Sequence, residues 1–239
     1  MNITLDLHIH SAASPDGRMS LEEIVQTARA RGLNGVAVTD HDVTLENPPA
    51  FDNFLVIPGC EFSTEFGHLL GLFLRESIGQ MSFVRTVNAI HAQGGLAVIA
   101  HPFEHTRDGS RIMPFARKLD GVEVWNGRAE RKIRDANALA RAFAEEQELR
   151  CFAGSDAHLP EEIGNGAVSL NVNTLTLSAV KTALLNNEVT ITGRRGASLS
   201  VARSQYTKLQ KLHAGPSAYA RWLLFAAKCA AEDALRKEN

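Results

Sequence analysis

The stretch that decides the fold is Asp6-Leu7-His8-Ile9-His10, followed at a short distance by Asp16-Gly17. Side chains alternate between the two faces of a β-strand, so this segment places polar groups on one face and apolar groups on the other. The polar face holds Asp6, His8 and His10, and the apolar face holds Leu5, Leu7 and Ile9. Such a strand suits a barrel wall with a metal ion inside, although histidines near an N-terminus are also ordinary surface side chains.

Composition limits the class of protein. The chain has 239 residues, a net charge of −2 and 44% hydrophobic residues, which is typical of a globular protein and gives no general case for nucleic acid or an anionic membrane. Cys60, Cys151 and Cys229 form no CxxC pair, so neither a disulfide framework nor a thiolate zinc site is expected. No signal peptide and no apolar run of membrane-spanning length is seen, and we expect a cytoplasmic protein.

Helix and strand patterns alternate along the chain. A capping box from Ser20 to Glu23 opens a helix, and Gly32 ends it. Strands are expected over residues 33–39, 55–58, 68–74, 96–100, 121–125, 151–154 and 167–172, and further helices over 83–93, 130–148 and 178–186. This alternation predicts a mainly parallel sheet with helices outside. An open doubly wound sheet is the alternative, but no Gly-rich phosphate loop follows the first strand.

Polar residues recur where the predicted strands end. Six of the nine histidines lie at or beside strand ends: His8, His10, His41, His68, His101 and His158. Carboxylates are supplied by Asp16, Glu61 and Asp156. Barrel enzymes place their active sites at the carboxyl ends of strands, and imidazole with carboxylate suits zinc, manganese or iron. Nine candidate ligands are too many for one tetrahedral site, so two or three divalent metal ions are expected.

Clustered divalent metals suit the hydrolysis of phosphate esters. They generate hydroxide near neutral pH, clamp phosphate oxygens and stabilise the leaving oxygen. A serine nucleophile is less favoured, because Ser155 lies outside any Gly-x-Ser-x-Gly elbow.

With these residues in place, the sequence resembles the PHP (polymerase and histidinol phosphatase) family of metal-dependent phosphoesterases. The resemblance is carried, in the family's order, by His8-Ile9-His10, Asp16-Gly17, Thr39-Asp40-His41-Asp42, Gly59-Cys60-Glu61, His68, Ala100-His101-Pro102 and Gly154-Ser155-Asp156-Ala157-His158. It implies an α/β fold, a distorted (β/α)7 TIM-like barrel, around a trinuclear metal centre.

The resemblance also implies how the ligands are shared among three metals. One metal would be held by His8, His10, Glu61 and Asp156. Glu61 would bridge to a second metal, held by His68 and His101. Asp16, His41 and His158 would hold the third. Asp16 stands where some members of the family have histidine, which bears on metal preference.

Other polar residues in the same loops are candidates for contact with a substrate. His105 could protonate the leaving group, a role that a metal-bound water could also fill. Arg107, Asn126 and Arg128 are candidate substrate contacts, because arginine grips phosphate with two hydrogen bonds. For each arginine a solvated loop charge is the simpler interpretation, and Asn126 could instead tie down a loop.

The C-terminal part of the chain differs in composition from the rest. Residues 1–195 are expected to form the barrel, and residues 196–239 a basic extension that ends in a helix opened by Pro216. Residues 189–231 contain no acidic side chain but seven basic ones: Arg194, Arg195, Arg203, Lys208, Lys211, Arg221 and Lys228. Such a bias can attract a phosphate backbone or a phosphorylated substrate, although a solvated face is the simpler interpretation.

The sequence therefore favours a metal-dependent phosphoesterase that hydrolyses phosphate monoesters of small molecules or nucleotides with a metal-bound hydroxide. The alternative is a 5′-3′ exonuclease acting on RNA or DNA ends. A third hypothesis, from a different class, is a non-enzymatic PHP-like module whose metals only hold a fold or a partner surface. The complete set of ligand positions argues against the third.

Overall fold

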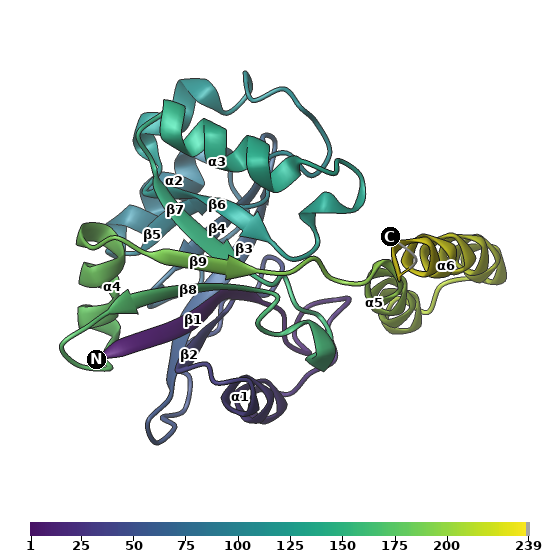
Figure 1. Cartoon of the computed structure of the whole chain (residues 1–239), viewed down its shortest axis with the longest axis horizontal. Coiled ribbons are helices and arrows are strands. Elements are labelled where there is room, and N and C mark those ends of the chain that lie inside the picture. The colour runs from purple at the N-terminus through teal and green to yellow at the C-terminus, as the bar shows by residue number, and fades with distance from the viewer. Residues whose placement is uncertain (238–239) are drawn as a thin grey trace.

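The protein has a barrel-like α/β body with two C-terminal helices beside it (Figure 1). The computed structural model describes residues 1–237. The strands are β1 (Asn2–Ile9), β2 (Gly35–Val38), β3 (Leu55–Thr64), β4 (Gly67–Leu72), β5 (Leu96–Ile99), β6 (Gly121–Asn126), β7 (Arg150–Gly154), β8 (Gly166–Asn171) and β9 (Thr190–Gly193). The α-helices are α1 (Leu21–Ala30), α2 (Phe83–Ala92), α3 (Ala136–Glu146), α4 (Leu177–Asn186), α5 (Ser198–Lys211) and α6 (Pro216–Lys237). Short 3₁₀ helices are η1 (Met113–Lys118), η2 (Ala129–Arg131) and η3 (Pro160–Glu162).

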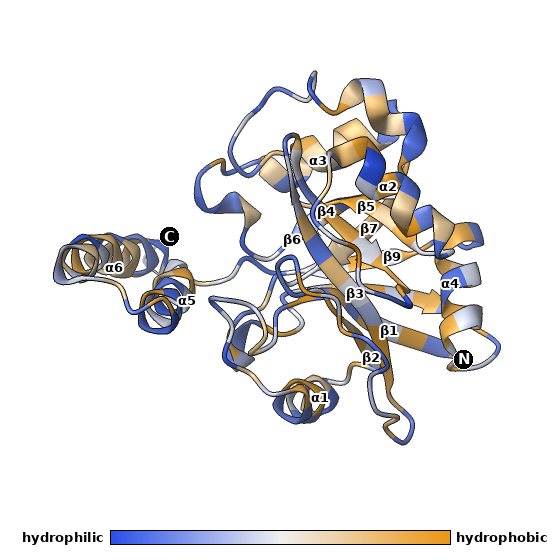
Figure 2. Ribbon diagram, turned by 180° about the vertical axis from the view of Figure 1, so that it is seen from behind, coloured by the Kyte–Doolittle hydropathy of each residue, from blue (hydrophilic) through white to orange (hydrophobic). Residues whose placement is uncertain are grey.

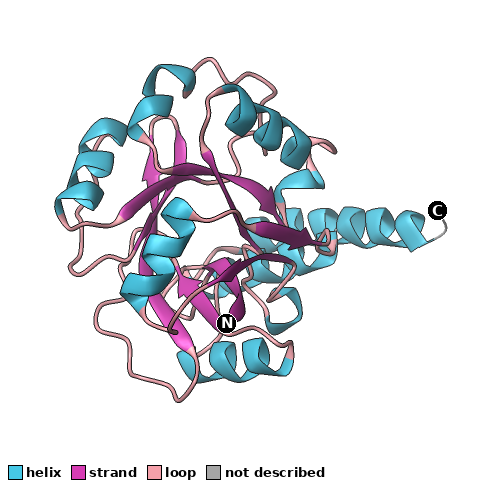
Figure 3. Ribbon diagram, turned by 60° about the vertical axis from the view of Figure 1, so that its left-hand side comes forward, coloured by secondary structure: helices cyan, strands magenta, loops and turns pink. Residues whose placement is uncertain are grey.

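All nine strands belong to one sheet, in the order β7-β6-β5-β4-β3-β2-β1-β8-β9. The sheet curls until the segment after β7 meets the end of β1. There the backbone N–H of Asp156 donates to the carbonyl of His8, and that of His10 donates to Ala157, both at 2.8 Å. Helices α1 to α4 lie outside this nearly closed barrel (Figure 3). The expected distorted α/β barrel with C-terminal helices is therefore confirmed.

The sheet is less parallel than the sequence predicts. Pairs β1–β2, β2–β3, β5–β6 and β6–β7 are parallel, whereas β3–β4, β4–β5, β1–β8 and β8–β9 are antiparallel. Strands β3 and β4 form a hairpin in which Thr64 pairs with Gly67 across a two-residue loop. Because β4 runs in the reverse direction, its start lies at the same end of the barrel as the carboxyl ends of β1 and β2. His68, at that start, is thereby brought to the functional end.

The capping box at Ser20 is present, but other element boundaries differ from expectation. Ser20 Oγ accepts from the Glu23 N–H, and the Glu23 carboxylate accepts from the Ser20 N–H. The helix expected from residue 130 begins only at Ala136, because residues 129–131 form the 3₁₀ turn η2. Strand β9 and helix α5 were not expected, since neither has a clear apolar period.

The core lies inside the barrel and between the barrel and its helices, where the apolar segments gather (Figure 2). Leu5 and Leu7 belong to the cluster that joins strands across the barrel, together with Phe152. Ile9 instead packs in the cluster beneath α1, with Ile24. The expected alternation of Leu5, Leu7 and Ile9 on one face is wrong for Ile9, because the register of β1 shifts between Asp6 and Ile9.

The C-terminal helices reach the functional end of the barrel through β9. This strand is antiparallel to β8, which is antiparallel to β1, so β9 runs in the same direction as β1. Helix α6 then packs on α5, with Trp222 Nε1 donating to the Ala202 carbonyl at 2.7 Å. The Asp233 carboxylate accepts from the N–H groups of Ser198 and Leu199, both at 2.8 Å, and so caps the start of α5. Within residues 1–237, no helix combines the length and apolarity needed to cross a membrane.

Barrel closure predicts the effect of a methyl group at Gly154. A Cβ there would lie 2.2 Å from the Cβ of His8 and 2.7 Å from its backbone nitrogen, so β7 and β1 would have to separate. We expect Gly154→Ala to lower the free energy of unfolding by about 1–3 kcal/mol, measured by urea denaturation. The matched control is Gly79→Ala, since nothing lies within 4 Å of a Cβ at that position. Equal stability of the two variants would contradict this account of barrel closure.

Candidate metal centre

The nine candidate ligands meet at one end of the barrel, although they come from seven segments of the chain. Positive φ angles at His101 (28°) and Asp156 (56°) mark two of these segments as conformationally strained. Such strain in residues other than glycine is concentrated at functional sites, where surrounding contacts maintain it.

The Glu61 carboxylate is the centre of the cluster. Its Oε1 lies 2.8 Å from His68 Nδ1 and 2.9 Å from His101 Nε2. Its Oε2 lies 2.8 Å from His41 Nδ1, 3.3 Å from His10 Nε2 and 3.5 Å from His8 Nε2. Only 1% of the Glu61 side chain is exposed, so this negative charge is neutralised by the groups around it and not by water.

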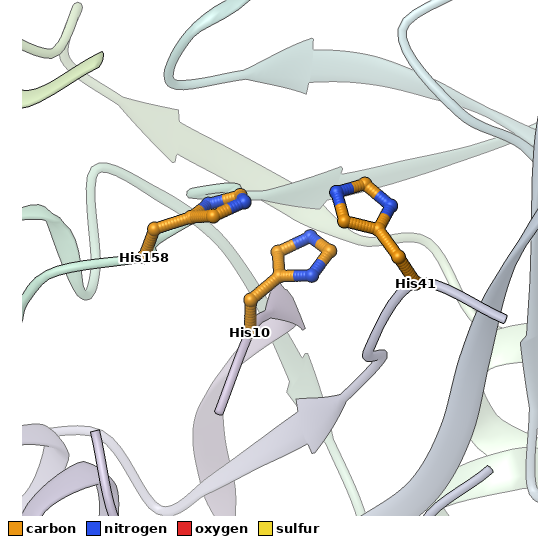
Figure 4. Close-up of side chains that lie close together, drawn as sticks. All are labelled: His10, His41 and His158. Carbon is orange, nitrogen blue, oxygen red and sulfur yellow. The ribbon is translucent and has the colours of Figure 1, made fainter. Parts of the chain in front are cut away.

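Three groups of side chains within the cluster have potential ligand atoms within 4.8 Å of one another. They are His8, His10 and Asp156; His8, Glu61 and His101; and His10, His41 and His158. Figure 4 shows the imidazoles of the third group facing a common space. Asp16 joins this third group, with Oδ1 3.3 Å from His158 Nε2 and 3.7 Å from His41 Nε2.

Hydrogen bonds on the far side of two rings fix which nitrogens face inward with lone pairs. His8 Nδ1 lies 2.9 Å from Glu123 Oε1 and therefore donates to it. Ser14 donates its own hydrogen to Asp40, so His10 Nδ1, 2.9 Å from Ser14 Oγ, must also be a donor. When both rings are neutral, the two Nε2 lone pairs point at each other across 3.1 Å. This arrangement requires a cation between them, either a proton or a metal ion.

The spacing of the surrounding atoms fits a metal ion. The Nε2 atoms of His8 and His10 lie 3.1 Å apart, and their distances to Glu61 Oε2 and Asp156 Oδ1 range from 3.2 to 3.7 Å. Ligand atoms about 2.0–2.2 Å from a tetrahedral ion lie about 3.3–3.6 Å apart. His8, His10 and Asp156 therefore offer three ligand atoms at a spacing that fits a divalent cation, and Glu61 Oε2 lies within 3.5 Å of both rings.

Two further buried atoms, His158 Nε2 and Asp16 Oδ1, lack hydrogen-bond partners among the described residues and could bind a metal ion. His158 Nδ1 lies 2.9 Å from the carbonyl oxygen of Asp156 and donates to it, which leaves a lone pair on Nε2 of the neutral ring. Neither this Nε2 nor the nearby Asp16 Oδ1 has a hydrogen-bond partner within residues 1–237. Buried polar atoms without partners are rare in folded proteins and indicate a missing ion or water.

Electrostatics show how the cluster balances its charge without metal. Burial favours neutral Glu61, but the neighbouring His68 and His8 outweigh it and hold the pKa of Glu61 well below its usual value. Burial opposes protonation of His8, but Glu123 and Asp156 raise the pKa of His8 well above the ordinary value. Burial also opposes protonation of His101, yet Glu61 and neighbouring acids raise its pKa to about 10. Without metal, protons on the His8 and His101 rings supply the positive charge that balances the carboxylates.

Two acidic residues that are not among the nine candidate ligands hold those ligands in place. Glu123 is buried, binds His8 Nδ1 through Oε1 and accepts the backbone N–H of His101 at Oε2, 2.9 Å away. Asp40 accepts hydrogen bonds from the backbone and hydroxyl groups of Ser11 and Ser14, and so fixes the loop that orients His10. Partners of this kind set the tautomer of ligating histidines. Glu123 lies in the predicted strand 121–125, where its alternation with valines was the signal available in the sequence.

The structure brings together some of the candidate substrate contacts and separates others. His105 is 60% exposed and lines the cavity beside the cluster, with Nδ1 3.1 Å from Lys132 Nζ. Arg128 lines the same cavity, but its buried guanidinium pairs with Glu162 at 2.5 Å. Asn126 is buried and donates to Glu123 Oε2 at 3.0 Å. It therefore helps to orient the Glu123 carboxylate, which in turn binds His8. Arg107 is exposed, pairs with Asp135 at 2.6 Å and lies outside the lining.

Two protein-family models match this sequence. The PHP domain matches residues 6–146, more than half of the chain, and the PHP-associated C-terminal family, PHP_C, matches residues 134–189. The chain belongs to the PHP domain family. The resemblance seen in the sequence is thus confirmed, and the chain carries clusters of imidazoles and carboxylates that are potential metal ligands.

Curated relatives cover much of this PHP protein. The uncharacterized protein MJ1587 of Methanocaldococcus jannaschii is 37% identical over 139 residues, which are 51% of this chain and 80% of the relative. A 5′-3′ exoribonuclease of Haemophilus influenzae is 25% identical across 65% of this chain and 90% of its own.

Solved structures share the fold of the PHP protein. A two-domain protein from Bacteroides vulgatus, containing a predicted PHP-like metal-dependent phosphoesterase, has a TM-score of 0.63 and 20% identity, over 87% of this chain and 70% of its own. The lesion-specific endonuclease EndoQ from Pyrococcus furiosus has a TM-score of 0.57 and 18% identity, over 80% and 58% of the two chains. At these identities the similarity concerns the fold.

The position of Glu123 predicts its contribution to metal binding. In Glu123→Gln the charge is lost, and the amide nitrogen replaces either Oε1, the acceptor at His8 Nδ1, or Oε2, the acceptor of both the His101 N–H and Asn126. We expect Mn²⁺ affinity to fall about 10–100-fold, measured by calorimetric titration. The control is Glu146→Gln on the exposed face of α3, which should bind metal as wild type does. Wild-type affinity in Glu123→Gln would show that this carboxylate does not hold the ligands.

The raised pKa values of His8, His41 and His101 predict that metal binding releases protons. A ring whose pKa lies above neutral pH, as that of His101 does at about 10, is protonated at pH 7, and a metal must displace that proton before it can bind. Mn²⁺ affinity should therefore rise between about pH 6 and pH 8, by about tenfold per pH unit for each proton released.

Proton release is measured by calorimetric titration in two buffers with different ionisation enthalpies. The control is His91→Gln, which changes a surface imidazole that pairs with Asp120 at 2.8 Å and should release the same number of protons as wild type. Equal Mn²⁺ affinity at pH 6 and pH 8, with a binding enthalpy that does not depend on the buffer, would contradict the charge balance described for the cluster.

Proposed function

We propose that the protein is a metal-dependent phosphatase that hydrolyses phosphate monoesters of small molecules or nucleotides. The observation that carries this proposal is the group of His8, His10 and Asp156, whose ligand atoms lie 3.1–3.7 Å apart, as around one divalent cation, beside two further groups of potential ligands. Membership of the PHP family supports the reaction class. Two or three divalent ions of zinc, manganese or iron are proposed as cofactors, because the donors are imidazoles and carboxylates without thiolate.

The proposed ligands are the nine residues foreseen in the sequence: His8, His10, Asp16, His41, Glu61, His68, His101, Asp156 and His158. When bound, the metals would activate water and neutralise the charge of the phosphoryl group. Glu61 would hold two of the ions in a fixed relation, since its two oxygens contact different histidines. Glu123 and Asp40 would keep the rings in the tautomer that offers Nε2.

The residues around the cluster would bind the ester and receive the leaving group. The cavity beside the cluster has a volume of about 450 Å³ and opens to solvent. His105 lies on its rim and is proposed to donate a proton to the leaving oxygen. Arg128 is proposed to attract the phosphate at longer range, because Glu162 already occupies its guanidinium. Asn126 is proposed to hold Asp156 in place, with its amide nitrogen 3.4 Å from Oδ2.

A second candidate function is the removal of nucleotides from the 5′ end of RNA or DNA. The similarity to an exoribonuclease over 65% of this chain favours it, and so does the open cavity, which would admit a strand end. The product separates the two functions, because a phosphatase leaves the strand intact and releases inorganic phosphate.

The test uses Mn²⁺-loaded protein with a 5′-phosphorylated RNA oligonucleotide and with small phosphate esters, the products being separated by chromatography. We expect inorganic phosphate to be released and the strand to stay intact. Removal of metal should abolish turnover while the circular dichroism spectrum remains that of a folded protein. His101→Ala should lower turnover by more than about a hundredfold, since loss of an outer partner of a metal ligand alone costs about 10–100-fold.

The control for His101→Ala is His91→Ala, which changes an imidazole outside the cluster. Release of mononucleotides would replace the phosphatase by the exonuclease. Unfolding on metal removal, with no product from any ester, would favour the non-enzymatic module. Wild-type turnover by His101→Ala would show that the site assignment is wrong.

A further inference from the structure

Helix α5 lies beyond both family matches, yet it supplies part of the wall of the cavity beside the metal centre. The matched residues end at 189, and α5 begins at Ser198. Val201, Gln205 and Lys208 line the same cavity as Asp16, His41 and Asp156 do. Their spacing of four and three residues places them in one row along the helix.

This row is held in place by contacts with the loops that carry the ligands. Lys211 Nζ donates to the carbonyl oxygens of Ala12 and Ser14, both at 2.7 Å, and Ser14 is the residue that orients His10. One turn earlier, Thr207 Oγ1 accepts from the Arg18 guanidinium at 2.8 Å. The helix is therefore a fixed part of the site.

Lys208 differs from the other basic residues of the extension. Lys211 is bound to backbone carbonyls, Arg203 pairs with Glu161 at 2.7 Å, and Arg194 donates to Asn165. Residues 189–231 contain seven lysines and arginines, all within the part of the chain that the structure describes, and of these Lys208 alone lines the cavity. Lys208 as a whole is half-buried, and its ammonium group has no hydrogen-bond or ion-pair partner within residues 1–237.

The cavity lining carries charges of both signs. It includes carboxylates and imidazoles of the candidate metal centre, and it also includes Lys208 together with Arg131 and Lys132. Its volume of about 450 Å³ lies in the range of about 300–1,000 Å³ that accommodates drug-sized ligands, so it is larger than a single phosphate needs. A ligand that filled it would bring a second negative charge to these cations while one phosphate lay at the candidate metal centre.

We propose that Lys208 binds a second phosphate of the substrate, so that α5 selects phosphoesters that carry another phosphate beyond the scissile one. This inference rests on the proposed function, because it takes the scissile phosphate to lie at the metal centre. The second phosphate belongs either to a small bisphosphate or to the next linkage of an oligonucleotide, since both present the same anion to the ammonium group.

The direct test measures binding without turnover. Propane-1,3-bisphosphonate and propylphosphonate, which cannot be hydrolysed, are titrated calorimetrically into Mn²⁺-loaded protein. We expect the bisphosphonate to bind more tightly, Lys208→Met to remove about tenfold of this preference, and Lys208→Arg to restore most of it. The preference of the wild type should also weaken as salt is raised. The control is Arg221→Gln, which removes one positive charge from the exposed face of α6, outside the cavity lining.

An unchanged preference in Lys208→Met would overturn the inference, as would an equal loss of affinity for both phosphonates. Turnover of propane-1,3-diol bisphosphate against propyl phosphate, and of a 5′-phosphorylated dinucleotide against a nucleoside monophosphate, then identifies the source of the second phosphate. The pair in which Lys208→Met lowers kcat/KM for the larger member only is the one selected. If the phosphonate preference depends on Lys208 but neither ester pair is hydrolysed, the proposed function fails while the binding site stands.

Discussion

The buried carboxylate of Glu61 is the constraint on which the functional end of the barrel depends. Five imidazoles lie within 3.5 Å of its two oxygens, and they come from β1, the segments after β2 and β5, and the start of β4. A buried charge without partners is expensive, so the barrel is stable only when these segments converge. Closure of the sheet, reversal of β4 and strained backbone at His101 all serve this convergence.

Orientation of the rings depends on a second layer of polar groups. Asp40 and Glu123 do not contact the space between the imidazoles, yet they decide which nitrogen of His10 and His8 carries a lone pair. The same carboxylate of Glu123 also holds the backbone of His101 and the amide of Asn126. Three segments of the chain are thereby tied to one side chain, which explains why a buried acid is placed within an otherwise apolar strand.

Much of the site could be predicted because strand ends and residue chemistry are both visible in the sequence. Histidines and acids at or beside predicted strand ends, together with Asp16 in the loop after the first strand, predicted nine residues that the structure brings together at one end of the barrel. The antiparallel course of β4 could not be predicted, since a hairpin loop of Glu65 and Phe66 has no strong turn signal. Nor could the register shift that turns Ile9 away from Leu5 and Leu7, because its cause is the pairing of β1 with its neighbours. The role of Arg107 was open in the sequence, and its pairing with Asp135 is a long-range contact that periodicity does not reveal.

The C-terminal extension shows how a segment without ligands becomes part of a site. Its basic composition is visible in the sequence, but composition does not distinguish Lys211, which binds two carbonyl groups, from Lys208, which faces the cavity. That distinction follows from the direction of β9, which delivers α5 to the functional end. Helix α6 then stabilises this position, because Asp233 caps α5 and Arg236 donates to the Ser198 hydroxyl at 2.8 Å. An extension that only solvated the barrel would not need a capped helix fixed to the loop that orients His10.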